Sequence, residues 1–74
     1  MEQFIKDKIE EIAFSRVNND DLLWTDKILD SITLVELIVE IESEYNIKVP
    51  MNEVIVENFE TVELIIKYIE SKKA

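Results

Sequence analysis

Ser31 is the residue of this chain whose type and position best suit chemistry. It follows Asp30 and opens a segment, residues 31–45, whose apolar spacing predicts a helix. A serine nucleophile of the hydrolase kind needs a histidine base, and the 74 residues include no His. They include no Cys and no Gly either, which excludes thiol chemistry, disulfides, zinc fingers and glycine-rich phosphate loops. We therefore predict no catalytic residue and no metal site, so any reaction at Ser31 must be performed by another protein.

Two long amphipathic segments are expected to position this serine. Apolar residues recur at spacings of three and four over about residues 2–17 and again over about 31–45, which predicts two helices. Ser31 is a good N-cap for the second helix, and Asp30 beside it suits the positive end of the helix dipole. Asn46 is a residue type that ends helices.

Shorter elements complete the predicted fold, an all-α, small four-helix bundle with three main helices and one short one. Pro50 forbids simple continuation of the second helix. Residues 51–58 are expected to hold a short helical turn around Val54 and Ile55, with an extended stretch over residues 54–56 as the alternative. Thr61 is the expected N-cap of the last helix. We expect a single domain over residues 1–74. Its predicted core is drawn from the main helices: Phe4, Ile9, Ile12, Leu34, Leu37, Ile38, Ile41, Val62, Ile65 and Ile69.

A long loop, residues 18–30, joins the first two predicted helices. Loops of this length in a small domain are usually functional or packed by their own side chains. Apolar residues interrupt this loop and are expected to fasten it to the core: Leu22, Leu23, Trp24, Ile28 and Leu29.

The charge of the chain limits its partners. The net charge is −9, and residues 18–60 carry eleven acidic and two basic side chains. Such a field repels nucleic acid and anionic membranes. No apolar run approaches the ~18 residues of a transmembrane helix, and the start of the chain has no signal-peptide stretch. We therefore expect a cytoplasmic monomer that binds neither nucleic acid nor a membrane interior.

The second predicted helix has an outer face that suits protein docking. Ile32, Val35 and Val39 form an apolar strip outside the core arc, and Glu36 and Glu40 belong to an acidic stripe without a compensating base. A half-exposed apolar strip flanked by carboxylates is typical of a docking surface for basic partners. The predicted docking residues are Ile32, Val35, Glu36, Val39, Glu40 and Glu42.

The pattern around Ser31 resembles that of the acyl carrier protein family, which includes peptidyl and D-alanyl carriers. Leu29-Asp30-Ser31-Ile32 opens the second helix, Val49-Pro50 follows it, and Phe59-Glu60-Thr61-Val62 precedes the last. The resemblance covers nearly the whole chain. It implies that a phosphopantetheinyl transferase attaches 4′-phosphopantetheine from coenzyme A to Ser31, with Asp30 helping that enzyme to recognise the site. The arm supplies the thiol that the chain lacks.

The resemblance further implies a non-catalytic carrier. It would hold acyl or aminoacyl groups as thioesters and present them to ligases or synthases with basic docking surfaces. The nature of the cargo stays open. Lys27 stands where many carriers have Gly, and the long interval from Pro50 to Thr61 is closer to D-alanyl carriers, whereas the acidic second helix is typical of fatty-acid carriers.

Other classes of protein remain alternatives. An acidic helical module that is never modified would have the same composition, and the mass of the chain after treatment with a phosphopantetheinyl transferase discriminates the two. A calcium-binding loop over residues 18–26 lacks the acid ladder, the Gly and the final Glu of an EF-hand. An enzyme is the weakest alternative, because so short a chain offers little enclosed pocket.

Overall fold

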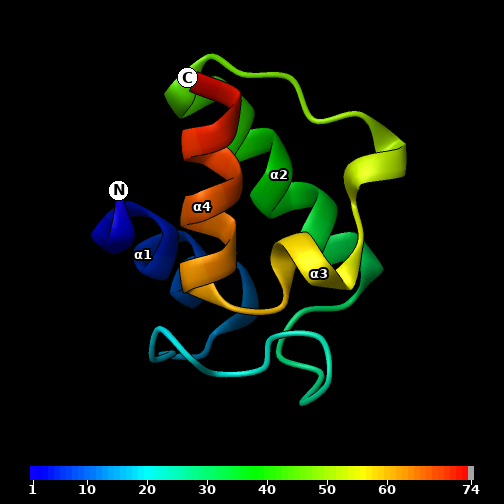
Figure 1. Ribbon diagram of the computed structural model, residues 1–74. Helices are drawn as coiled ribbons and strands as arrows, with labels where there is room; N and C mark the ends of the chain where they lie inside the picture. Colours follow the sequence, from blue (N-terminus) through cyan, green and yellow to red (C-terminus); the bar gives the residue numbers. More distant parts are fainter. Residues whose placement is uncertain (74) are drawn as a thin grey trace.

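Three main helices form the frame of the structure (Figure 1). They are α1 (Glu2–Ala13), α2 (Ser31–Tyr45) and α4 (Val62–Lys73). Between α2 and α4 lie a 3₁₀ turn, η1 (Met51–Glu53), and the short helix α3 (Val56–Phe59). The computed structural model describes residues 1–73, and no strand occurs within them. The predicted all-α fold, with three main helices and one short one, is therefore confirmed.

The first helix is shorter than its apolar pattern predicted. α1 ends at Ala13, because Phe14 adopts the left-handed conformation (φ 57°) and donates its N–H to the carbonyl of Glu10. The prediction of a helix to residue 17 is therefore wrong. Val17 fits the apolar period of the helix, but it is buried as part of the following loop.

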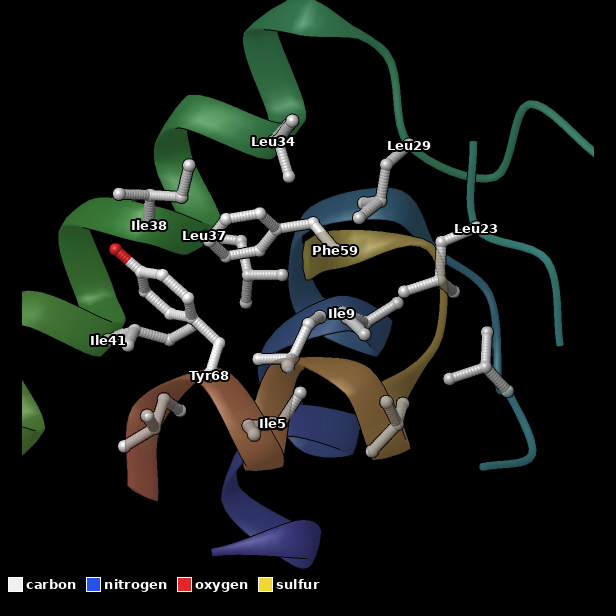
Figure 2. Packing of buried hydrophobic residues seen from close by; sticks show 14 of the residues in the cluster. Ile5, Ile9, Leu23, Leu29, Leu34, Leu37, Ile38, Ile41, Phe59 and Tyr68 are labelled. Atoms are coloured by element: carbon white, nitrogen blue, oxygen red, sulfur yellow. The ribbon is translucent and has the colours of Figure 1, made fainter. Parts of the chain in front are cut away.

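The core lies where α1, α2 and α4 face one another, with the long loop and α3 closing one end (Figures 1 and 2). Eight of the ten predicted core residues are buried, and Phe4 and Ile12 are partly buried against them. Phe59 of α3 is fully buried at the centre of the core, where Figure 2 shows Leu34 and Leu29 pointing toward it. The sequence pattern missed its importance because a four-residue helix has no measurable period.

The segment between α2 and α4 is helical on both sides of the predicted position. The helical turn predicted within residues 51–58 is present, but it is not centred on Val54 and Ile55, which separate η1 from α3. Of the residues in the extended alternative, Ile55 is extended and Val56 begins α3. Glu53 fastens this segment to α4, since its Oε1 accepts from the Tyr68 hydroxyl at 2.5 Å and from Lys72 Nζ at 2.7 Å. Burial, together with the hydrogen bond to Glu53, raises the pKa of Tyr68, and the contacts with Lys72 and Tyr68 lower the pKa of Glu53.

Residues at the ends of α2 and α4 conform to the predicted helix boundaries. Asn46 ends α2 in the left-handed conformation and donates its N–H to the carbonyl of Glu42. The Thr61 hydroxyl accepts from the Leu64 N–H at 3.1 Å, which confirms its capping role. Lys73 Nζ reaches the Tyr45 carbonyl at 3.4 Å, so the carboxyl ends of α2 and α4 lie together.

Truncation of Leu37 tests this packing. Leu37 is fully buried in α2, so Leu37→Ala should lower the free energy of unfolding by ~2–5 kcal/mol through lost burial and a new cavity. Val39→Ala removes apolar atoms from the exposed face of the same helix and is the control. Urea denaturation measures both. A loss below ~0.5 kcal/mol for Leu37→Ala would mean that this face of α2 is not the core.

Candidate functional site

Asp30, and not Ser31, caps the amino end of α2. The Asp30 Oδ1 accepts from the N–H of Ile32 at 3.0 Å and of Thr33 at 2.8 Å, and the Thr33 hydroxyl accepts from the Asp30 N–H at 2.8 Å. This reciprocal arrangement is a capping box. The prediction of Ser31 as N-cap is therefore wrong, because the longer carboxylate side chain reaches both amides from the preceding residue.

The carboxylate of Asp30 is adapted to this role. Hydrogen bonds from the Thr33 N–H, the Thr33 hydroxyl and the Ile32 N–H favour its charged form and hold the pKa of Asp30 below its ordinary value. A negative charge at this position also suits the positive end of the α2 dipole.

Ser31 consequently has a free side chain. It is the first residue of α2 and is exposed, and its hydroxyl makes no hydrogen bond within residues 1–73. Two of the N–H groups that a helix terminus would offer to an anion, those of Ile32 and Thr33, are already occupied by Asp30. Two features still favour a phosphate group here: the positive end of the dipole of the 15-residue α2, and the accessible Ser31 hydroxyl.

An apolar hollow of about 400 Å³ begins at Ser31. Three segments form its walls: the long loop, the first turns of α2, and the stretch after Pro50. Its lining residues are Trp24, Leu29, Asp30, Ser31, Leu34, Val35, Met51 and Val54. The sequence pattern placed Trp24 in the loop but gave no sign that it would stand beside Ser31.

Glu60 holds the loop that forms one wall of this hollow. Its carboxylate accepts from the N–H of Trp24 at 2.9 Å, and from the N–H and hydroxyl of Thr25 at 3.1 and 2.8 Å. Its backbone carbonyl accepts from the Leu23 N–H at 2.7 Å. The bonds from Thr25 and Trp24 lower the pKa of Glu60. Sequence reasoning missed this role, because 35 residues separate Glu60 from Thr25.

The loop is fastened by only some of the predicted side chains. Leu23 and Leu29 are buried, and Trp24 and Ile28 are packed against the core from its edge. Leu22 is 41% exposed, so the prediction that it fastens the loop is wrong. The Leu29 N–H donates to the Leu23 carbonyl at 2.9 Å, which closes the loop just before Asp30.

The outer face of α2 carries the expected apolar strip. Ile32 is 70% exposed, Val35 49% and Val39 55%, and Glu36 beside them is exposed. An open groove of about 350 Å³ runs between α1 and α2 along this strip. It is lined by Lys8, Glu11, Ile12, Val35, Glu36, Val39 and Glu40. Apolar atoms therefore form its floor, and charged side chains form its rim.

Two of the predicted docking carboxylates have partners in the chain. Lys8 of α1 lies 3.3 Å from Glu40, so the prediction of an acidic stripe without a compensating base is wrong for Glu40. This contact raises the pKa of Lys8. The Glu42 Oε2 accepts from the Val49 N–H at 2.9 Å and thereby holds the chain that leaves α2. Lys8 and Val49 both lie outside α2, so the periodicity of α2 could not predict these contacts.

The amino end of α2 thus combines an exposed serine, a capped helix terminus and an apolar hollow in a small helical protein. Comparison with known sequences specifies the family. Residues 16–69 match the family described as "Phosphopantetheine attachment site", so the chain belongs to that family. The prosthetic group of the family is covalently attached 4′-phosphopantetheine.

Relatives in streptococci are D-alanyl carrier proteins. The protein from Streptococcus equi subsp. zooepidemicus (strain MGCS10565) is 51% identical over 51 residues, and that from Streptococcus pyogenes serotype M5 (strain Manfredo) is 45% identical over the same length. Each match covers 69% of this chain and 65% of the relative. The chain is thus aligned with somewhat less than two thirds of these proteins.

No helix among the described residues is long and apolar enough to cross a membrane. The longest, α2, has 15 residues and carries four carboxylates along its length.

The pH dependence of stability tests the role of Glu60. Because its pKa is lowered in the folded state, Glu60 stabilises the fold above its unfolded pKa, and this contribution is lost as the pH falls through the folded value. The difference in unfolding free energy between the wild type and Glu60→Gln should therefore be largest near pH 7 and shrink in acid. Denaturation at a series of pH values, monitored by Trp24 emission, measures it.

Glu70→Gln is the control for this comparison. Its carboxylate is exposed on α4 and accepts no hydrogen bond from another described residue, so the substitution should change stability little. Equal effects of the two substitutions at every pH would contradict the anchoring role of Glu60.

Proposed function

We propose that this protein is a non-catalytic carrier and that Ser31 is the attachment residue for 4′-phosphopantetheine. The observation that carries the proposal is the division of roles at the start of α2. Asp30 supplies the cap, so the exposed Ser31 hydroxyl is free to be modified without loss of the helix terminus. The apolar hollow beside it and the family match over residues 16–69 support the same residue.

The proposed modification is a group transfer performed by a phosphopantetheinyl transferase. The Ser31 oxygen forms a bond to the phosphorus that carries pantetheine in coenzyme A, the pyrophosphate bond breaks, and adenosine bisphosphate leaves. The transferase removes the hydroxyl proton, since the chain has no histidine to do so. Asp30 is fixed one residue away and is available to orient the transferase.

The arm supplies the thiol on which an acyl or aminoacyl group is carried as a thioester. Among possible cargoes we favour an aminoacyl group of the D-alanyl kind, because the relatives in Streptococcus equi and Streptococcus pyogenes carry that name. Residues 1–74 would then act as one carrier domain, and its partners would be the transferase and the ligases or synthases that load and use it. A cytoplasmic location and a monomeric state stay predictions.

The docking surface that we propose centres on the exposed strip of α2 and the groove beside α1. Ile32, Val35 and Val39 supply apolar contact area, and Glu36 supplies a carboxylate at the rim that has no ion pair among residues 1–73. Such a surface suits a partner with an apolar side chain flanked by Lys or Arg. Glu40 and Glu42 contribute less freely because each is already engaged within the chain.

The attachment residue is tested by intact mass and peptide mapping after incubation with coenzyme A and a broad-specificity phosphopantetheinyl transferase. The wild type and Ser43→Ala, an exposed serine elsewhere on α2, should gain one arm, and Ser31→Ala should gain none. Ser31→Ala should keep its unfolding free energy within ~0.5 kcal/mol, because Ser31 is not the cap. A mass gain that persists in Ser31→Ala, or none in the wild type, would refute the proposal.

The docking surface is tested by charge reversal. Glu36→Lys should still accept the arm on Ser31 but be loaded with D-alanine by a D-alanine ligase at least about threefold more slowly at low salt, because rim charges steer the encounter. The difference should diminish as salt screens the charges. Glu70→Lys makes the same charge change on α4 and should be loaded at the wild-type rate. Equal slowing of loading in both variants would show that the effect comes from the net charge of the protein, and it would contradict the proposed docking surface.

A further inference from the structure

Phe14, at the carboxyl end of α1, has a large apolar side chain that the fold itself does not use. It is 90% exposed, more than any other large apolar side chain among the described residues, and it lies outside the hydrophobic core. Its backbone adopts the left-handed conformation (φ 57°, ψ 34°), which Gly and Asn adopt more easily than an aromatic residue does. Asn46 occupies the corresponding position at the end of α2. Neither packing nor backbone geometry therefore accounts for a phenylalanine at this position.

The surface around Phe14 is acidic. A shallow hollow of about 460 Å³ on the outer face of α1 is lined by Asp7, Glu10, Glu11 and Phe14. Arg16 lies 3.4 Å from Glu10. Lys8 lies 3.5 Å from Glu11, but it also binds a carboxylate of α2. Asp7 makes no ion pair within residues 1–73, so the carboxylates outnumber the cations beside the aromatic ring.

This acidic surface is continuous with the groove between α1 and α2. Glu11 lines both the groove and the hollow beside Phe14. The two helices run antiparallel, since the ring of Phe4, near the start of α1, packs edge-on against the ring of Tyr45, the last residue of α2. Phe14 therefore lies toward the end of the bundle where α2 begins with Ser31.

We propose that Phe14 is an apolar anchor for the ligase that loads the arm, and that its ring enters an apolar pocket of that enzyme flanked by Lys or Arg. The proposal rests on the proposed modification of Ser31. Burial of the ring removes apolar area from water, and the carboxylates around it pair with basic side chains at the rim of the pocket. Together with the apolar strip of α2, Phe14 gives the ligase two separate apolar contacts on two helices.

The position of Phe14 favours an enzyme that acts at the far end of the arm over one that acts on Ser31 itself. Val35 lines both the hollow beside Ser31 and the groove between α1 and α2, so it stands between them. Phe14 lies beyond the groove, on the outer face of α1. The transferase must bring its catalytic centre to the Ser31 hydroxyl, whereas the ligase reacts with a thiol at the end of the arm and can bind farther from that residue. The ligase, and not the transferase, therefore covers Phe14.

Phe14→Asn tests the anchor with little risk to the fold. Asn adopts the left-handed conformation readily, so the variant should unfold in urea at the same concentration as the wild type or a higher one. Both proteins are given the arm with coenzyme A and a phosphopantetheinyl transferase, and are then loaded by a D-alanine ligase at a series of carrier concentrations. The KM for the Phe14→Asn carrier should rise at least about fivefold while kcat stays within about twofold, because the lost contact serves binding and not the chemistry at the thiol.

Two further variants separate the anchor from a general effect of apolar surface. Phe14→Leu keeps an apolar side chain and should raise KM less than Phe14→Asn does. Leu22→Asn removes another exposed apolar side chain, in the long loop and outside both hollows and the groove, and should keep the wild-type KM.

An unchanged KM in Phe14→Asn, or an equal rise in Leu22→Asn, would overturn the anchor and leave the proposed function intact. Slower attachment of the arm to Phe14→Asn, with loading unchanged, would assign the residue to the transferase and would also overturn the anchor. No mass gain in the wild type would refute both proposals.

Discussion

The carboxylate of Asp30 is the group on which the site depends. A helix terminus leaves N–H groups that some side chain must satisfy, and a serine at that point would ordinarily turn its hydroxyl inward to do so. Here Asp30 accepts from Ile32 and Thr33, and Thr33 returns a hydrogen bond to the Asp30 backbone. Ser31 is thereby placed on a rigid helix with its hydroxyl exposed, which is the combination that an external modifying enzyme needs.

The wall opposite the serine depends on a contact between distant parts of the chain. Glu60 lies between α3 and α4, and its hydrogen bonds hold Trp24 and Thr25 in the long loop. Lys27, further along this loop, adopts a left-handed conformation (φ 58°), which costs a residue other than Gly about 1 kcal/mol. The loop therefore adopts this conformation without Gly, the residue type that adopts it most easily.

Sequence periodicity predicted α2 well and its neighbours less well, for reasons that lie in particular residues. α2 is bounded by residue types with strong local preferences, Asp30 and Asn46, and its buried arc includes Leu37 and Ile41 as expected. α1 ends at Phe14, a residue type that gives no warning of a left-handed conformation. The same limit explains why Ser31 was predicted to be the cap, since Ser and Asp are equally good caps and only geometry decides between them.

A helical wheel does not show contacts between elements, and in this protein those contacts determine which carboxylates of α2 are free. The carboxylates of α2 look equivalent in sequence, but Lys8 binds Glu40 and the Val49 N–H binds Glu42, while Glu36 stays at the open rim of the groove. Among the predicted docking carboxylates, Glu36 is therefore the one left free to meet a basic side chain of a partner. Since the strip begins at Ile32, one residue after Ser31, the proposed attachment residue, a partner docked on this strip through Glu36 would be oriented relative to Ser31 and not merely attracted.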